Sequence, residues 1–519
     1  MSEISNNSRG ANELRSYCAS EFLSEDGLRQ IFERHTYPHV NNYYFFLEAC
    51  INERVDEGII QCLLEYFPAA VSANYLGQTP LHLNFACGNK NMTLNIIQLL
   101  IDAAPDSVRS VTNRGRMPLH NLCMNKILDK AAALEILTLL IEKCPEAIRH
   151  ANNNGDLPIH IAAKTSKSTE FFRMLIEAYP GSERITDPAG NLPLHYACAD
   201  NTLATVEYLH KLYPDAINHT TTDGYHPIHY AIVGVFKKRK SFSPSDSVDI
   251  VKFLLDCDPK VTLQKGEGKS PLHYACFWDY NDSTIEAALE MIKAIYDAYP
   301  EAIEDNAIVS TIERYHQRVQ AFINSELVYS RKAKDHRLMT TPDGNGRLPL
   351  HTALQHNVRL GSIKLLVKGN PSAIRNSDTN FAMPLHLASQ HHNSSNVVQY
   401  LVGLDTSTLD AVDKEGGTAL HYACRGAKYD TIALLLEKYD AVSVSKRNAK
   451  GKLPIDLLWE SNEVEDRGSI EYTEGVFRLL KAYPEMVMVM NIDMQQQQQS
   501  AAASCPSQNG KKRKFGNEE

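Results

Sequence analysis

The sequence predicts an all-α repeat solenoid, in which short helix pairs joined by tight turns stack side by side. The first observation is a three-residue motif, Pro-Leu-His or a close variant of it, that recurs along the chain. The second is a glycine five residues before almost every motif histidine, and the third is a proline after most of the apolar segments between copies. The motif histidines are His82, His120, His160, His195, His229, His273, His351, His386 and His421, and a tenth copy reads Pro454-Ile455-Asp456.

The spacing of these copies indicates small modules and not one globular core. Successive histidines are 38, 40, 35, 34, 44, 78, 35 and 35 residues apart, and a further 35 residues reach Asp456. A period of this length is typical of units that bury apolar surface only against their neighbours. Such an array favours a binding surface over a single active site.

Each unit begins with a turn and a short first helix, as the segment from Thr186 to Tyr213 illustrates. Residues Asp187 to Gly190 are predicted to form a turn. A glycine that recurs at the same position of each repeat, here called the slot glycine, indicates backbone with φ > 0. Pro193 then opens the helix, where its fixed φ and missing N–H carry no penalty. The slot glycines are Gly77, Gly115, Gly155, Gly190, Gly224, Gly268, Gly346, Gly416 and Gly451.

A longer second helix is predicted over residues 202–212, with Val206, Leu209 and Leu212 on one stripe. Tyr213-Pro214 ends it, because proline disfavours helical backbone at the residue before it. The same ending recurs as Phe67-Pro68, Ala104-Pro105, Cys144-Pro145, Tyr179-Pro180, Asp258-Pro259, Tyr299-Pro300, Asn370-Pro371 and Tyr483-Pro484.

The turn, the slot glycine, Pro-Leu-His-x-Ala and the paired helices resemble the ankyrin repeat. The resemblance covers residues 41–490 and implies an array of about 10–12 units with β-hairpin turns that project to one side and a concave groove. It also implies that each motif histidine hydrogen-bonds the backbone of a turn.

The chain departs from the ankyrin consensus at the start of the first helix, where the consensus has threonine. Only Thr79, Ser270 and Thr418 keep a hydroxyl there. Because a buried leucine can offset a lost cap, we expect the replacements to be buried under the neighbouring hairpin. These replacements are Met117, Leu157, Leu192, Leu348, Met383 and Leu453. Phe381 takes the place of a slot glycine, so we expect an altered or strained turn there.

The ends of the chain differ from the array. Residues 1–40 form an N-terminal segment that we expect to be partly disordered, with weak order over 1–20 and a short helix over 21–34. Residues 43–67 have two helical patterns but lack the Pro-Leu-His motif, and we expect them to form a degenerate first unit. Residues 491–519 read as a disordered, Gln-rich tail with a terminal basic cluster.

Two units carry insertions. Residues 236–246, FKKRKSFSPSD, read as a basic loop. Residues 303–338 fill a doubled gap, and Ile308, Ile312, Tyr315, Val319 and Phe322 recur at helical spacing. This pattern favours one long inserted helix over a decayed repeat.

The composition fits a folded, soluble protein, with 43% hydrophobic and 22% charged residues among 519. A net charge of -9 argues against binding nucleic acid through bulk charge. The 11 cysteines are spread out, and Cys123, Cys198, Cys276 and Cys424 each lie three residues after a motif histidine, as buried packing residues would. We therefore expect a reducing compartment, so an intracellular protein in the cytoplasm or the nucleus. No signal peptide or membrane span of about 20 apolar residues is evident.

No pattern in the sequence indicates an enzyme, a cofactor or a metal. The histidines are spaced by whole repeats, roughly 10 Å apart in a stack, which is too far for shared metal ligation. Gly268-Lys269-Ser270 resembles the end of a phosphate-binding loop, but Leu263 stands where the upstream glycine would be. We expect no catalytic residue, no cofactor and no metal ion.

The surface of the hairpins is the candidate site. The residue after the slot glycine is expected near a hairpin tip, and the selected positions are Arg116, Tyr225, Lys269, Arg347 and Lys452. Four of these five are basic, which favours an acidic segment of a partner protein, although solvated tips tolerate any polar residue.

Two basic clusters with the sequence KKRK are candidate nuclear import signals that an import receptor would bind. One is Lys511, Lys512, Arg513 and Lys514 in the tail, and the other is residues 237–240. A solvated run of charge is the alternative for both. The sequence thus predicts a non-enzymatic protein–protein interaction scaffold, with a nuclear regulator whose basic segments contact nucleic acid or import receptors as the alternative.

Overall fold

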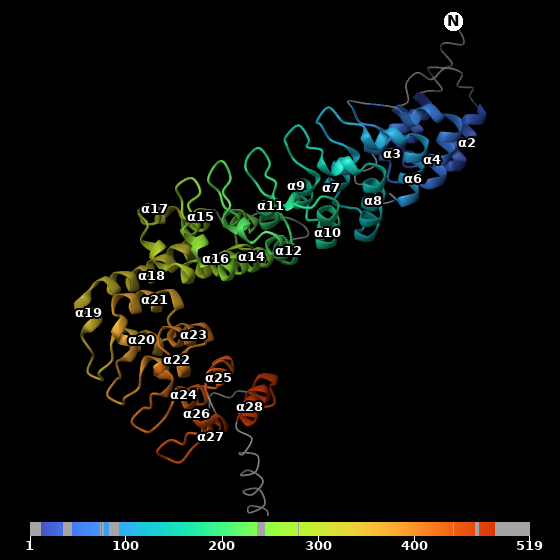
Figure 1. Cartoon of the computed structure of the whole chain (residues 1–519). Helices are drawn as coiled ribbons and strands as arrows, with labels where there is room; N and C mark the ends of the chain where they lie inside the picture. The colour runs from blue at the N-terminus through green and yellow to red at the C-terminus, as the bar shows by residue number, and fades with distance from the viewer. Residues whose placement is uncertain are drawn as a thin grey trace, which may run out of the picture. The chain divides into compact units, whose positions relative to one another are not determined.

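The computed structural model describes residues 12–34, 44–72, 74, 77–82, 93–235, 244–278, 280–439, 441–461 and 467–482. The chain divides into two compact units, Met1–Ile323 and Asn324–Glu519, which are described separately. Both units consist of helix pairs in series, so the prediction of an all-α repeat solenoid is confirmed. In the first unit, the loops between pairs project from one side of the helices (Figure 1).

The unit around His195 has the predicted order of elements. The first helix, α11 (Pro193–Asp200), has proline at its first position, and the second helix, α12 (Leu203–Leu212), buries Val206 and Leu209. Tyr213 leaves helical geometry at φ −142° and ψ 82°, and Pro214 then opens a short 3-10 turn, η5 (Pro214–Asn218). The prolines after the second helices therefore start a 3-10 turn that leads into the next hairpin.

Within the first unit the helices alternate between short first helices and longer second helices. Their bounds are α2 (Glu25–Arg34), α3 (Tyr44–Ile51), α4 (Glu57–Tyr66), α6 (Leu94–Ala103), α7 (Pro118–Met124), α8 (Lys130–Lys143), α9 (Pro158–Lys164), α10 (Thr169–Ala178), α13 (Pro227–Gly234), α14 (Pro244–Cys257), α15 (Pro271–Phe277), α16 (Ile285–Ala298) and α17 (Asn306–Thr311). Helix α18 (Gln317–Lys334) runs from the first unit into the second.

The second unit has the same alternation. Its helices are α19 (His336–Thr340), α20 (Pro349–Gln355), α21 (Leu360–Gly369), α22 (Pro384–His391), α23 (Ser395–Leu404), α24 (Ala419–Arg425), α25 (Tyr429–Leu436), α26 (Ala441–Val444), α27 (Pro454–Glu460) and α28 (Ile470–Ala482).

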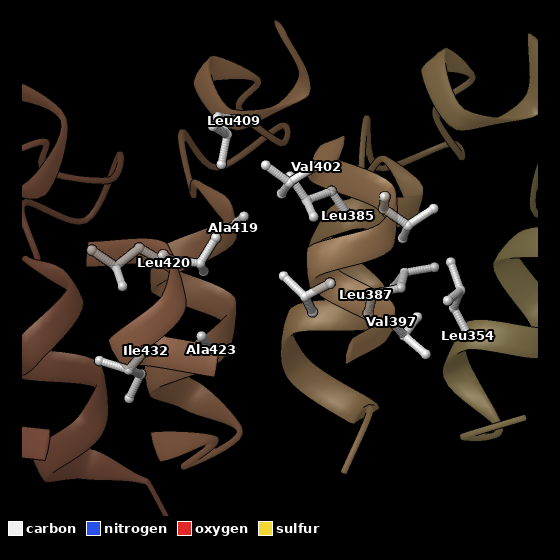
Figure 2. Packing of buried hydrophobic residues seen from close by; sticks show 14 of the residues in the cluster. Leu354, Leu385, Leu387, Val397, Val402, Leu409, Ala419, Leu420, Ala423 and Ile432 are labelled. Atoms are coloured by element: carbon white, nitrogen blue, oxygen red, sulfur yellow. The ribbon is translucent and has the colours of Figure 1, made fainter. Parts of the chain in front are cut away.

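The core of the second unit runs along the stack. Figure 2 shows Leu354 of α20, Leu385 of α22 and Leu420 of α24, which belong to successive repeats. The buried cluster extends from Met339 to Leu479, so each repeat covers the apolar face of the next. This arrangement is the one that a solenoid without a central core requires.

Three side-chain predictions for the repeat can be compared with the structure. Each slot glycine in the array has a positive φ, and Phe381 adopts φ +59° in the same region, so the strained turn is confirmed. The replacements for the capping hydroxyl are buried except Met383, which is half-buried. Cys123, Cys198, Cys276 and Cys424 are buried, and burial raises the pKa of the Cys123 thiol to about 12.

The N-terminal segment is more ordered than predicted. Residues 12–18 are helical, with Leu14 and Cys18 buried, so the expected weak order over 1–20 is wrong for these residues. The Asn52 side chain fixes the end of this helix by donating hydrogen bonds to the carbonyl oxygens of Cys18 and Ser20 at 2.9 and 2.7 Å. The predicted degenerate unit is present as α3, α4 and the 3-10 turn η1 (Pro68–Ser72).

Two predicted boundaries need correction. The basic loop was expected to reach residue 246, but α14 already begins at Pro244. The single helix expected through Ile308 and Phe322 is instead two helices, α17 and α18, separated by the 3-10 turn η8 (Ile312–Arg314) and by Tyr315 in extended conformation. Gln320 explains the break, since its amide donates hydrogen bonds to the carbonyl oxygens of Glu313 and Tyr315 at 3.2 and 2.7 Å.

Candidate partner-binding face

The face formed by the first helices and hairpins is built around the motif histidine. In the repeat of α11, the Leu192 amide donates a hydrogen bond of 3.1 Å to Nδ1 of His195. An Nδ1 that accepts leaves the ring proton on Nε2. The same bond joins Thr79 to His82, Met117 to His120, Leu157 to His160, His226 to His229, Leu348 to His351, Met383 to His386 and Thr418 to His421, at 3.0–3.3 Å.

The second ring nitrogen reaches the next repeat. Nε2 of His195 lies 3.3 Å from the carbonyl oxygen of His219, which leads into the following hairpin. Equivalent pairs are His82 with Arg116, His160 with Ile185, His351 with Asn376, His386 with Ala411 and His421 with Lys452, at 2.9–3.2 Å. Each of these six histidines therefore links the start of its own helix to the next hairpin, which confirms the structural role predicted for the motif in these repeats. Among the described residues, Nε2 of His120 and of His229 is buried without a hydrogen-bond partner.

In the repeat of His273, a serine hydroxyl and not the histidine ring bonds the start of the first helix. Ser270 begins α15, and its hydroxyl oxygen accepts a hydrogen bond from the His273 amide at 3.2 Å, as a serine cap does. Nδ1 of His273 is buried without a hydrogen-bond partner in the part of the chain that the structure describes. The hydroxyl has therefore replaced the histidine as the partner of the helix start.

Burial keeps the motif histidines neutral. Removal from water disfavours the charged ring and lowers the pKa of His82, His120 and His229 to about 4 and that of His195 to about 3. The pKa values of His160, His351, His386 and His421 are lowered for the same reason. At neutral pH these side chains act as hydrogen-bonding groups without charge.

A second recurring residue, which the sequence analysis missed, shapes each hairpin. It lies three residues before the slot glycine, and in the repeat of α22 it is Asp378. One carboxylate oxygen of Asp378 accepts hydrogen bonds from the amides of Asn380 and Ala382 at 2.8 and 3.0 Å. The recurrence of this slot was visible in the sequence as Thr112, Asn152, Asp187, Thr221, Asp343, Asp378, Asp413 and Asn448.

Backbone hydrogen bonds link neighbouring hairpins at their tips. The Lys414 amide donates to the carbonyl oxygen of Asn380 at 2.8 Å, and the Ala449 amide donates to that of Glu415 at 2.7 Å. The same bond joins Asn153 to Arg114, Thr222 to Ala189 and Thr379 to Asn345. In these five places the backbone of one hairpin is thus bonded directly to that of the next.

The predicted site residues do not lie at the hairpin tips. The amides of Thr112, Thr221, Asp343 and Asn448 donate to the carbonyl oxygens of Arg116, Tyr225, Arg347 and Lys452, and the Gly266 amide donates to that of Lys269, so these five residues close the base of their hairpins. The tips are formed one to two residues earlier. The five residues thus lie near the tips without forming them, and their role in binding a partner stays a prediction.

The side chains of these hairpin-base residues contact their own repeat or the next one. Arg347 donates to the buried Asp378 carboxylate at 3.3 Å and to Oε1 of Gln355 at 2.8 Å. Lys452 pairs with Glu460 at 2.5 Å, and the Lys269 ammonium lies 4.6 Å from the centre of the Phe277 ring. Burial lowers the pKa of Arg116, and Tyr225 packs against His229 and Tyr274. The basic members are therefore partly neutralised or covered by the chain itself.

A row of tyrosines follows the motif histidines on this face. Tyr196, Tyr230 and Tyr274 of the first unit and Tyr422 of the second occupy the position directly after the histidine. The Tyr196 hydroxyl donates to Asp187 at 2.5 Å, the Tyr422 hydroxyl donates to Asp413 at 2.8 Å, and the Tyr230 hydroxyl donates to Asn191. These bonds hold the half-buried rings of Tyr196 and Tyr230 and the buried ring of Tyr422 between helix and hairpin. The sequence analysis missed these tyrosines, although their recurrence directly after the motif histidine could have indicated them.

Some predictions fall outside the described residues. The tail cluster of Lys511, Lys512, Arg513 and Lys514 lies beyond residue 482, and the loop cluster of residues 237–240 lies between 235 and 244, so the import signals stay predictions. Over the described ranges, no helix is long and apolar enough to cross a membrane. The same ranges contain no group of three or more His, Cys, Asp or Glu residues that could hold a metal ion.

Comparison with known families agrees with this geometry. Residues 359–448, from the start of α21 to the hairpin before α27, match the model for ankyrin repeats in three copies. Residues 140–197, which include α9, α10 and most of the first helix α11, match the model for ankyrin repeats in many copies. No curated protein matches the chain.

Proposed function

We propose that this chain, which is an ankyrin repeat protein, is a non-enzymatic scaffold that binds a protein partner on the face formed by its first helices and hairpins. Ankyrin repeats are protein interaction modules, and the unit architecture offers an extended surface that neighbouring repeats share. The partner and the process it serves are not specified by the fold.

The observation that carries the proposal is that several hairpins are held twice, namely those of Thr222, Thr379, Lys414 and Ala449. A histidine such as His386 holds the hairpin to the preceding helix, and a backbone bond such as that from Lys414 to Asn380 holds it to the neighbouring hairpin. A surface fixed in this way loses little conformational entropy on binding, so more of the contact energy contributes to affinity.

The test compares single exposed positions on opposite faces. Thr352 of α20 occupies the position directly after the motif histidine, whereas Gln399 lies on the exposed side of the second helix α23. We expect Thr352→Arg to reduce capture of the protein's partners and the matched Gln399→Arg to leave capture unchanged. Asn154→Arg at a hairpin tip and Glu207→Arg on the exposed side of α12 make the same pair in the first unit.

Equal capture by all four variants would show that this face does not bind the partner. Unchanged thermal unfolding of the variants serves as the control, because each position is exposed and its substitution removes no buried contact.

The prediction of an acidic partner segment belongs to this proposal. Arg347 and Lys452 already have acidic neighbours, Asp378 and Glu460, so an acidic partner would have to compete with these groups. Lys269 has an aromatic neighbour and retains its charge for a partner. Charge reversal at Lys269 is therefore the most informative single test of an acidic partner segment.

A further inference from the structure

One hairpin of the first unit differs from the others in its backbone. The amides and carbonyl oxygens of Gly266 and Lys269 bond to each other at 3.1 and 2.9 Å, which leaves a two-residue turn of Glu267 and Gly268. Both turn residues have positive φ, +47° for Glu267 and +77° for Gly268. Such turns favour Asn-Gly or Asp-Gly, and a left-handed residue with a long side chain costs about 1–2 kcal/mol. Glu267 is therefore a residue that the local backbone disfavours.

The Glu267 carboxylate has a specific neighbour in the preceding hairpin. Burial raises the pKa of Tyr225, and the Glu267 carboxylate beside its hydroxyl raises it further. The Tyr225 ring lies directly on the backbone of Gly266, where an added Cβ would come within 2.6 Å of the ring. The strained turn thus fixes a carboxylate and an aromatic ring beside each other.

Further rings extend this group, which we call the Tyr225 cluster and which consists of Tyr225, Glu267, Tyr274 and Trp278. The ring centres of Tyr225 and Tyr274 are 5.9 Å apart, and those of Tyr274 and Trp278 are also 5.9 Å apart at an interplanar angle of 88°. The three rings are half-buried, and Glu267 is exposed. The cluster therefore presents aromatic surface and a carboxylate to solvent at the same place.

The charges that act on these tyrosines are negative. Asp223 and Glu267 raise the pKa of Tyr225, and Glu267 also raises that of Tyr274, in both cases after the larger effect of burial. Asp223 and Glu267 are exposed on adjacent hairpins. The nearby Lys269 ammonium lies over the ring of Phe277, which shows that an aromatic ring on this face accommodates a cation.

We propose that the Tyr225 cluster binds a lysine or arginine side chain carried by an extended segment of the partner protein. An aromatic face with an adjacent carboxylate attracts a cation by ring quadrupole and by charge, and the fixed rings need no reorganisation. A neutral, proline-rich segment would use the rings but would gain nothing from Glu267 and Asp223. The inference rests on the proposed function, because it assigns partner chemistry to part of the same face.

Tryptophan fluorescence can report binding to the Tyr225 cluster. It has 2 tryptophans, Trp278 in the cluster and Trp459 in the second unit, so Trp459→Phe leaves Trp278 as the only indole. We expect the Trp278 fluorescence of this full-length variant to change saturably with a peptide of alternating glycine and arginine. Added salt should weaken the binding, because the interaction depends on charge. The matched peptides with glutamate or with proline in place of arginine should have no effect.

The decisive variant is Glu267→Asn, which removes the carboxylate and suits the left-handed turn. We expect at least a tenfold increase in the dissociation constant of the arginine peptide, together with an unfolding midpoint that is unchanged or higher. A purely structural role of Glu267 would instead lower the midpoint, because its interaction with Tyr225 is lost. Glu415→Asn is the control, since Glu415 is exposed and also precedes a slot glycine, in the second unit.

Three results would overturn the inference: equal binding by Glu267→Asn, no binding of the arginine peptide, or binding of the proline peptide instead. The failure of the proposed function is separate, because it appears as equal partner capture by Thr352→Arg and Gln399→Arg. If those face variants differ and the arginine peptide does not bind, only the partner chemistry is wrong.

Discussion

Asp456 accepts a hydrogen bond of 2.7 Å from the backbone amide of Leu453, in the place where eight earlier repeats use Nδ1 of a histidine. A carboxylate can fill this role because the helix start needs only an acceptor. It cannot donate a hydrogen bond to a following hairpin, as Nε2 of His386 does to Ala411. In six of these repeats histidine therefore also connects the helix to the next hairpin, and Asp456 stands in the final copy of the motif.

Exchanging the two residue types should have unequal effects. His386→Asp removes the bond to Ala411 and buries a carboxylate, so we expect the free energy of unfolding to fall by about 3 kcal/mol. Asp456→His keeps the acceptor and should change it by less than about 0.5 kcal/mol. Urea titrations of both variants measure this difference, and equal losses would contradict the two-sided role of the histidine.

Phe381 is the residue whose replacement should stabilise the array. Its φ of +59° is unfavourable for a side chain with a Cβ, and the ring is 57% exposed, so removing it loses little burial. Phe381→Gly should raise the free energy of unfolding by about 0.5–1 kcal/mol after the extra flexibility of glycine in the unfolded chain is included. Gly416→Ala at the same slot of the next repeat should lower it. A loss of stability in Phe381→Gly would mean that the ring makes a contact that outweighs the strain.

The sequence predicted the repeat because each unit depends on local chemistry. Proline at the first helical position, glycine at positive φ and the motif histidine are properties of short segments, and all three are found as expected. The break at Tyr315 was missed because both helices bury residues at the same spacing, so the apolar period continues through the turn. The Tyr225 cluster was not predicted because it joins residues of two hairpins through a backbone conformation that the local sequence disfavours.

Acid should weaken the fold in a defined pH window. The pKa of His82, His120 and His229 is about 4 in the folded protein, well below the ordinary value of 6.5. The unfolded chain therefore binds more protons between these values, so stability is full above about pH 6.5 and is lost as the pH falls towards 4. Each such histidine contributes about 3 kcal/mol to this loss. Denaturant titrations at pH 7.5, 5.5 and 4.5 measure the slope, and a constant free energy of unfolding would show that these rings are not buried as neutral groups.

Arg347 should have a structural role that Lys452 lacks. The Asp378 side chain is 2% exposed, and Arg347 is the cation that pairs with it, whereas Lys452 and Glu460 form a more exposed pair. Arg347→Ala should lower the free energy of unfolding by about 1–2 kcal/mol, and Lys452→Ala by less than about 0.5 kcal/mol. Thermal unfolding of the two variants tests this. If neither substitution changes the free energy of unfolding, Arg347 has no structural role and its charge is available to a partner.

Deletion of one internal repeat tests the account most directly. Removing residues 379–413 joins Asp378 to Lys414, and because Asp378 and Asp413 hold the same hairpin slot, the remaining repeats keep their register. Hydrogen exchange of the second unit should then rise only in α20, α21, α24 and α25, which adjoin the deletion, while α27 keeps the protection of the intact protein. A uniform loss of protection across the second unit would show that its helices share one indivisible core and would contradict the solenoid.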